Sequence, residues 1–185
     1  MSFNNDGKLD VDEALRMVDL AASGDPDGDM AMSVQSKGSP VEGESRRAYD
    51  DGKKRMDVKG YFFRSWVHTP PGSNKGRVSL TTLSVVRESD AASASLAGLL
   101  NKQADDLEVV ISVYKASGDD SPEEQPTLEI TLKQARLDQH CLLSGGALGR
   151  PCEVLSFQYR TLVLASAPQV KSGLRGAVRT CSFGS

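Results

Sequence analysis

The sequence predicts a mainly β fold, closed as a small antiparallel β-barrel or packed as a β-sandwich, with one inserted α-helix and an N-terminal helical extension. Two observations predict it. Between residues 30 and 166, at least six short segments alternate apolar and polar side chains, and glycine- or proline-rich turns separate them. A single segment in this region has helical spacing instead. Strands in this number most economically close on themselves or pack as two sheets.

Length and composition limit the class of protein. A chain of 185 residues can bury one good core, with or without appendages. No apolar run approaches the roughly 20 residues of a membrane span, and no basic start precedes an apolar stretch at the N-terminus. We therefore expect neither a membrane span nor a signal peptide. An odd number of cysteines (Cys141, Cys152 and Cys181) argues against a disulfide scaffold and for synthesis in a reducing compartment.

The net charge of −3 is unevenly distributed along the chain. Residues 1–29 carry eight acidic and two basic side chains, whereas residues 166–185 carry three basic and no acidic ones. Opposite charge at the two ends could steer head-to-tail contacts between copies, and two solvated tails are the alternative.

The chain begins with an oxygen-rich segment, residues 2–13, that is close to the calcium loop of an EF-hand. Gly7 stands where that loop turns sharply, although Ser2 replaces its first aspartate and no entering helix precedes it. We expect no cofactor, with Ca²⁺ as the one candidate, because a hard cation needs several oxygens wrapped around one point. The ligands would be Asn4, Asp6, the Lys8 carbonyl, Asp10 and Glu13.

A short amphipathic helix is predicted directly after this segment. An acidic turn that caps this helix is the alternative interpretation of the oxygen-rich segment, because carboxylates stabilise the positive end of a helix dipole. The apolar side of the helix is predicted to consist of Val11, Leu15, Val18 and Ala22.

Three strands are predicted before the inserted helix, over residues 32–36, 56–67 and 77–87. In the third strand, the alternation of apolar and polar residues shifts by one position between Leu80 and Leu83. A β-bulge, which inserts one extra residue into a strand, would keep the apolar side chains on one face. The helix follows an N-cap at Ser89 and Asp90. Its apolar side chains, at i, i+4, i+7 and i+8, are Ala92, Leu96, Leu99 and Leu100.

A strand over residues 107–113 follows the helix, and the stretch from Pro126 to Ala165 then predicts two more strands joined by a glycine-rich connection. The second of these, residues 153–165, is polar on one face at its start and apolar on both faces at its end, around Leu162 and Leu164. We expect another element or another subunit to cover that end.

The sequence gives little support to catalysis or to nucleic-acid binding. The soft nucleophile or ligand candidates, His68, His140, Cys141 and Cys152, match no zinc spacing, and no G-x-S-x-G motif occurs. The basic run at residues 53–55 has no aromatic neighbour in an acidic chain. We expect a protein that is not an enzyme and does not bind nucleic acid.

Four local phrases occur in a fixed order along residues 30–166, and together they resemble the haemolysin-coregulated protein (Hcp) family, the tube protein of type VI secretion systems. The phrases are Val41-Glu42-Gly43-Glu44-Ser45; Met56-Asp57-Val58 leading to Ser65-Trp66; Val78 to Val86 followed by Glu88-Ser89-Asp90 and the helix; and Leu128-Glu129-Ile130-Thr131-Leu132 followed by Glu153 to Tyr159.

The resemblance implies a β-barrel protomer without an active site, which forms six-membered rings that stack into a hollow tube. The implied partners are further copies of the chain, the sheath and spike proteins of the apparatus, and effector cargo in the lumen. The protein would reside in the bacterial cytoplasm before assembly and leave through the apparatus without a signal peptide. The expected subunit interface includes Trp66, Leu162 and Leu164.

Three regions follow from this interpretation: an acidic extension (residues 1–29), an Hcp-like barrel (30–166) and a basic tail (167–185). The connection over residues 67–76 is shorter than the loop that many family members place between stacked rings. Two alternatives compete with a type VI tube protein. One is a tube protein of a phage tail or a phage-derived injection particle, and the other is a calcium-responsive soluble binding module.

Overall fold

The computed structural model describes residues 9–23, 29–47, 49, 51–72, 74–114, 125–145, 147–168 and 176–184. Its helices are α1 (Val11–Ala22) and α2 (Ala92–Asn101). Its strands are β1 (Met30–Ser36), β2 (Ser39–Pro40), β3 (Met56–Asp57), β4 (Gly60–Phe62), β5 (Ser65–His68), β6 (Arg77–Leu80), β7 (Leu83–Glu88), β8 (Leu107–Val113), β9 (Leu128–Leu143), β10 (Cys152–Gln158), β11 (Thr161–Ser166) and β12 (Arg179–Gly184).

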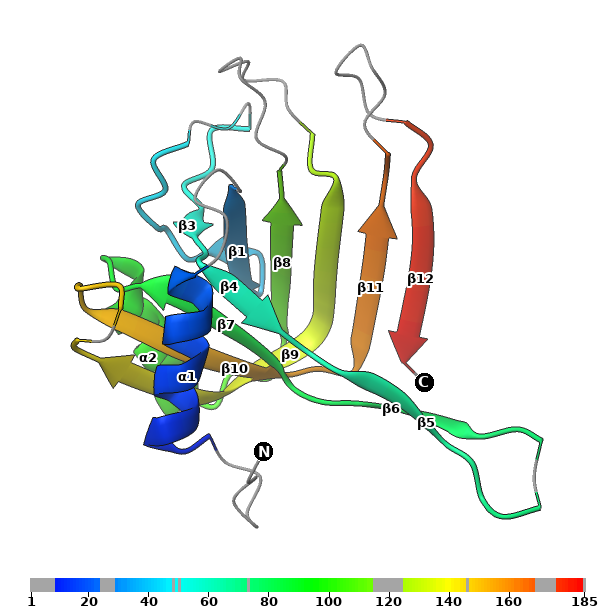
Figure 1. Cartoon of the computed structure of the whole chain (residues 1–185). Helices are drawn as coiled ribbons and strands as arrows, with labels where there is room; N and C mark the ends of the chain where they lie inside the picture. Colours follow the sequence, from blue (N-terminus) through cyan, green and yellow to red (C-terminus); the bar gives the residue numbers. More distant parts are fainter. Residues whose placement is uncertain are drawn as a thin grey trace.

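The strands other than β5 and β6 belong to one strongly bent antiparallel sheet (Figure 1). The bend divides this sheet into two halves, and β9 runs through both of them. The first half of β9 pairs with β8 and β11, and its second half pairs with β10. Between the two halves, Gln134 has a φ of 48°, and the register with β8 shifts there. Such a bulge increases bend and twist, so one 16-residue strand serves both halves of the sheet.

The sheet closes into a barrel through the bent segment at residues 56–62. β3 pairs with β1, and β4 pairs with β7. Between them, Val58 N donates to Met30 O (2.9 Å) and Lys59 N donates to Val86 O (2.8 Å). The circuit β1–β8–β9–β10–β7–β4/β3–β1 is therefore continuous, which confirms the predicted mainly β, antiparallel barrel with an inserted helix.

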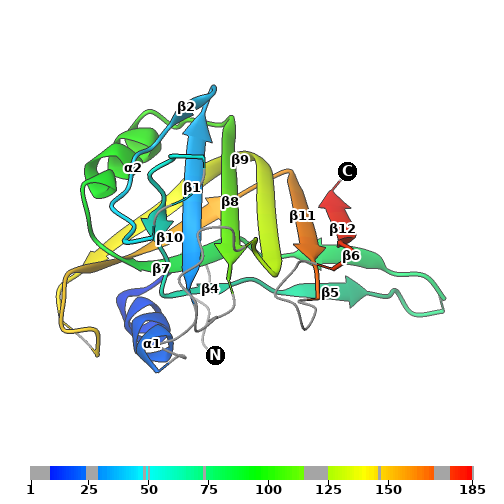
Figure 2. The same cartoon turned by 90° about the horizontal axis from the view of Figure 1, so that it is seen from above.

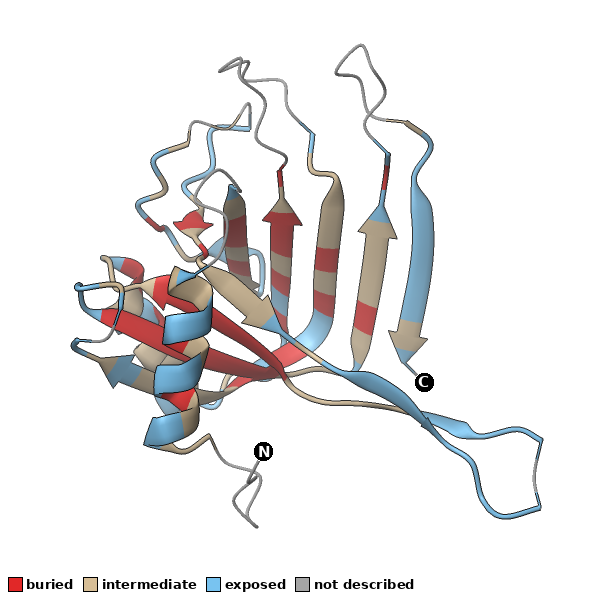
Figure 3. Cartoon of the chain, viewed as in Figure 1, coloured by how far each residue is buried: buried red, intermediate tan, exposed pale blue. Residues whose placement is uncertain are grey.

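The interior of the barrel is the main hydrophobic core, which α2 also helps to fill (Figures 2 and 3). The N-cap of α2 is Ala91, one residue after the predicted Ser89 and Asp90. Asp90 still holds the start of the helix, because its Oδ1 accepts from Ala92 N at 2.8 Å. Large, fully buried side chains in this core include Met32, Leu83, Leu96, Ile130, Leu155 and Phe157.

A second, smaller core lies on the outer face of the sheet, under α1. Ala14 and Val18 of the helix pack there against Val86, Cys152 and Val154. β7 and β10 are therefore buried on both faces (Figure 3), one by the barrel interior and the other by α1. The acidic N-terminal extension thus contributes a helix that is part of the packed structure.

The buried stripe of α1 differs from the predicted one. Val11 is 60% exposed and Leu15 is 37% exposed, whereas Ala14 and Val18 are fully buried. The helix lies close to β4, where a Cβ at Gly60 would be 3.1 Å from the Cβ of Ala21. Ala21 permits this close approach because its side chain is small. The apolar spacing of the helix could not reveal which side faces the sheet, because that side is set by contacts with β4, β7 and β10.

Three predicted strands are interrupted in the structure. The segment at residues 56–67 contains β3, β4 and the start of β5. The phase change in residues 77–87 marks a break between β6 and β7 at Thr81, where the chain passes from a projecting hairpin into the barrel, and is not a bulge. Residues 153–165 contain β10 and β11, which belong to different halves of the sheet. The basic tail contains a strand, β12, that pairs with β11.

Candidate assembly surfaces and a buried charge network

The hairpin of β5 and β6 projects from the barrel, and among the described strands these two pair only with each other (Figure 1). At its tip, Gly72 has a φ of +80°, in the left-handed region that glycine adopts at little cost. The hairpin carries apolar side chains into solvent: Trp66 is 41% exposed, and Val67 and Val78 are more exposed still. The Arg64 guanidinium lies over the Trp66 ring, 5.0 Å from its centroid, and holds one side of it.

The other two predicted interface residues lie on β11. Leu162 is fully buried, because β9 and β12 flank it and its side chain belongs to the barrel core. Leu164 is half-buried against the same core. The chain itself therefore covers Leu162, and Leu164 keeps some surface for a neighbour. β12 pairs with β11 over six residues and presents exposed side chains, Cys181 among them.

The predicted calcium ligands fall partly outside the described residues: Asn4, Asp6 and Lys8 do. Asp10 is the N-cap of α1, and its Oδ1 accepts from Glu13 N at 2.7 Å. Glu13 lies in the first turn of the helix. Within the described ranges, no three His, Cys, Asp or Glu side chains converge as metal ligands. Calcium binding by residues 2–13 stays a prediction.

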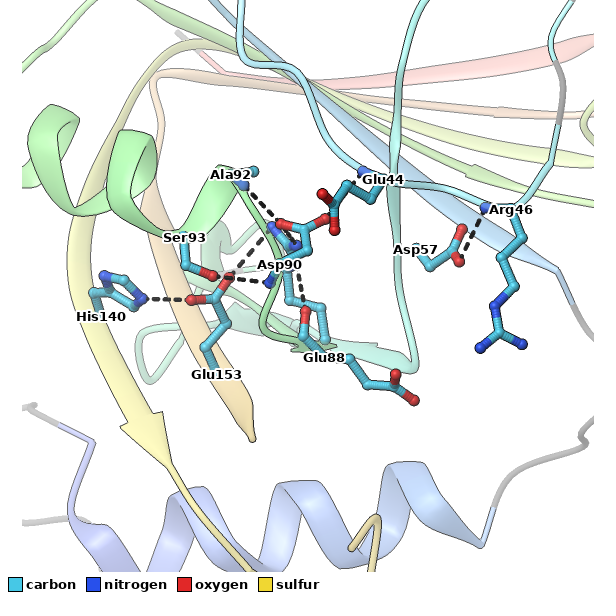
Figure 4. A network of polar contacts seen from close by, with 10 residues as sticks. Glu44, Arg46, Asp57, Glu88, Asp90, Ala92, Ser93, His140 and Glu153 are labelled. Carbon is cyan, nitrogen blue, oxygen red and sulfur yellow. Dashed lines mark hydrogen bonds and ion pairs between the residues drawn. The ribbon is translucent and has the colours of Figure 1, made fainter. Parts of the chain in front are cut away.

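A buried charge network connects the barrel wall to α2 (Figure 4). Arg87, whose side chain is 1% exposed, pairs with Asp90 and with Glu153, whose side chain is 0% exposed. Nη1 of Arg87 and Oε1 of Glu153 lie 3.2 Å apart as an ion pair, without the alignment of a hydrogen bond. His140 Nε2 lies 2.7 Å from the other Glu153 oxygen.

Asp90 extends this network to two further segments. Its Oδ2 accepts from Glu44 N at 3.1 Å, and its own backbone N–H donates to Ser93 Oγ at 3.2 Å. The network thus joins β7, β9, β10, the start of α2 and the connection that contains Glu44. A single arginine cation thus lies between two carboxylates, almost without solvent, and removal of one partner would leave a buried charge uncompensated.

Sequence reasoning did not find this network, although a signal was present. Glu153 has the same strand phase as Leu155 and Phe157, both of which lie in the main core. A charged side chain at an inward position of an apolar strand indicates a buried partner, since an unpaired buried charge is very costly. The partner, Arg87, is opposite Glu153 in the β7–β10 register.

A surface cluster of aromatic and basic side chains also escaped the sequence analysis. The Arg47 guanidinium lies 4.1 Å from the Tyr114 ring, and the Arg55 guanidinium lies 4.1 Å from the Tyr49 ring. Arg55 also donates two hydrogen bonds of 2.9 Å to Asp51. The basic run at residues 53–55 therefore finds partners within the polar connection after β2. Arg47 joins this connection to Tyr114, which directly follows β8.

The histidine and cysteine side chains considered for catalysis lie in three different environments. His68 lies exposed on the hairpin, whereas His140 belongs to the buried network. Cys141 and Cys152 lie in the core beneath α1. Burial raises the pKa of both thiols, which lowers the thiolate fraction that a nucleophile needs.

Comparison with known proteins identifies the barrel. Residues 32–165, well over half of the chain, match the family described as "Type VI secretion system effector, Hcp". A comparison with curated proteins gave no match. None of the helices in the described ranges is long and apolar enough to cross a bilayer.

Solved structures of Hcp proteins share the fold. Hcp1 from Salmonella typhimurium superposes with a TM-score of 0.63 at 16% identity, over 84% of this chain and 95% of that one. Hcp3 from Pseudomonas aeruginosa gives 0.59 at 16% identity, over 85% and 97%. A mutant form of Hcp1 from the E. coli EAEC 042 pathovar gives 0.64 at 12% identity, over 84% and 97%. With its barrel, its inserted helix and the match over residues 32–165, the chain belongs to the Hcp family of type VI secretion systems.

Proposed function

We propose that this protein is a structural subunit that forms hexameric rings, and that the rings stack into the inner tube of a type VI secretion apparatus. The observation that carries the proposal is the family match over residues 32–165 on a closed barrel. The projecting hairpin supports it, because an isolated two-stranded hairpin with exposed Trp66, Val67 and Val78 gains stability when a partner covers it.

The proposal includes the partners and the route of the protein. Sheath proteins would surround the tube, a spike protein would cap it, and effectors would occupy its lumen. The subunit would be made in the bacterial cytoplasm and expelled through the apparatus as part of the tube, so it would need no catalytic centre. The Arg87–Glu153 network supports this passive role, since it is enclosed and joins strands instead of facing a ligand.

Light-scattering mass combined with negative-stain microscopy of one purified fraction tests the proposal. We expect particles of six times the 19.8 kDa chain, with six-fold rings and short stacks. A compact monomer at every concentration would contradict the proposal. The same measurement in calcium and in chelator tests the loop at residues 2–13. Rings in both would make that loop an accessory, and rings only in calcium would make it an assembly switch.

A further inference from the structure

Two exposed surfaces of this chain have opposite charge of equal size. The first, which we call the acidic helix surface, is α1 with its flanking residues, 9–23, and carries a net charge of −3. The second, the basic hairpin, comprises residues 64–80 and carries +3 with His68 neutral. The basic hairpin contains no acidic side chain. This composition makes the two surfaces electrostatically complementary.

Both surfaces also carry exposed apolar side chains. Nine large apolar side chains are exposed among the described residues, and six of them lie on these two surfaces. Charge alone gives weak contacts between solvated side chains, whereas apolar area surrounded by charge is typical of protein interfaces. The six are Val11, Leu15 and Leu20 on the acidic helix surface and Trp66, Val67 and Val78 on the basic hairpin.

The two surfaces lie at different ends of one molecule. α1 packs against β4, β7, β9 and β10, and the hairpin extends away from that side of the barrel in both views (Figures 1 and 2). They are therefore placed to contact other copies. A contact between two different surfaces of identical chains is heterologous, so its repetition closes a ring or continues along a stack.

We propose that the basic hairpin of one copy docks on the acidic helix surface of the next copy in the assembly. This inference rests on the proposed function and names a contact within it. The family match begins at residue 32, so α1 lies outside the matched region. The contact is therefore a feature of this chain's own extension, which would serve as a landing surface for the hairpin of a neighbour.

The acidic helix surface is fixed firmly enough to serve this purpose. The inner face of α1 is held by the buried Ala14 and Val18. The segment before the helix is held by Leu9 N, which donates to Gln139 Oε1 at 2.6 Å. Near its end, Asp19 Oδ1 accepts from Ala147 N at 3.4 Å. A helix anchored at both ends presents its outer face in one orientation, which lowers the entropic cost of docking.

Charge-reversed protomers test the contact. One variant carries Asp12→Lys and Glu13→Lys on the acidic helix surface, which leaves the Asp19 anchor in place, and the other carries Lys75→Glu and Arg77→Glu on the basic hairpin. We expect each variant alone either to form no rings or to form rings that do not stack, because like charges then face each other across the contact. An equimolar mixture should form the same rings and stacks as the wild type, because each reversed surface meets a surface of opposite sign on the other variant. Recovery also proves that both variants are folded.

A matched control is Asp105→Lys with Asp106→Lys, two exposed acids in the connection between α2 and β8. It changes the net charge as much as the helix variant does, and it should assemble like the wild type. Wild-type assembly by either single variant, or failure of the mixture to recover, would overturn the contact. If the wild type assembles and the variants do too, the contact is wrong and the tube function stands. If the wild type stays monomeric, both are wrong.

Discussion

Trp66 is the only tryptophan of the chain, and its side chain is exposed on the basic hairpin. If a neighbouring copy covers the hairpin, assembly should shift the tryptophan emission to shorter wavelength. Replacement by alanine should weaken assembly by about 2 kcal/mol, as removal of an aromatic anchor does. It should change the free energy of unfolding of the monomer by less than about 0.5 kcal/mol, as surface substitutions do. Emission that stays constant through assembly would show that the hairpin remains in solvent.

The Arg87–Glu153 pair makes a second prediction at the scale of single residues. Glu153→Gln leaves the buried arginine cation with one carboxylate fewer, so the free energy of unfolding should fall by about 3 kcal/mol in urea titrations. Glu108→Gln is the matched control, because Glu108 is exposed on β8. Its effect should stay within about 0.5 kcal/mol. Equal stability of the two variants would mean that the network contributes nothing to the fold.

Tyr159 predicts how stability depends on alkaline pH. Burial raises the pKa of its phenol from 10.0 to about 12, and the hydroxyl donates to Thr81 O at 2.7 Å. A pKa raised in the folded state gives stability that is complete below pH 10 and is lost between pH 10 and about 12, because the unfolded chain ionises first. The decline should be shallower in Tyr159→Phe, measured by chemical unfolding across this pH range. Identical slopes would exclude a role for this phenol.

At the scale of elements, α1 covers the thiols of Cys141 and Cys152, so we expect the packing of the helix to control how fast these thiols react. Val18→Asp places a charge in the apolar contact with Val86 and Val154, which costs several kcal/mol and should undock the helix. Cys141 and Cys152 should then react with a thiol reagent in native buffer nearly as fast as the exposed Cys181. Leu20→Asp, on the exposed side of the same helix, should keep the slow wild-type rates. Slow labelling in both variants would show that α1 does not protect these thiols.

Strands and helices that have one buried face and one solvent-exposed face could be predicted from the sequence. The alternation at residues 107–113 and the helical spacing of Ala92 and Leu96 correspond to β8 and α2. The break between β6 and β7 left a visible change of apolar phase between Leu80 and Leu83. Sequence patterns record which face is buried, and these elements obey that rule.

Elements with both faces covered were not predictable in the same way. β10 has no exposed face, because the barrel core and α1 cover its two sides, so the pattern merged it with β11. The rotation of α1 about its axis depends on the close approach of Gly60 to Ala21, which is a contact across the sequence. Of the predicted interface residues, Trp66 is exposed, whereas Leu162 is covered by the chain's own core. Tertiary packing decided each of these cases.

At the scale of the whole molecule, the net charge of −3 conceals the opposite charges of the acidic helix surface and the basic hairpin. If these surfaces meet in the assembly, association should weaken as salt rises, because the screening length falls from about 10 Å at 0.1 M to about 3 Å at 1 M. Sedimentation of the wild type across this range measures the effect. The charge-swapped mixture should also weaken with salt, but less steeply, because its reversed contact pairs a charge of +1 with one of −1. An assembly indifferent to salt would contradict the electrostatic part of the contact.

The family and the barrel could be inferred from phrases spread along residues 30–166, which nearly coincide with the matched residues 32–165. The parts on either side contain no such phrases. Helical spacing predicted α1, but its packing on β10 and the pairing of β12 with β11 became visible only in the structure. These additions distinguish this chain from a bare barrel.

Single-particle electron microscopy of the wild-type assembly tests the central claim most directly. We predict a ring of six barrels, with the hairpin of each copy lying on α1 of a neighbour in the same ring or in the next. Isolated barrels under all conditions, or a closed assembly of another symmetry, would contradict the tube subunit that we propose.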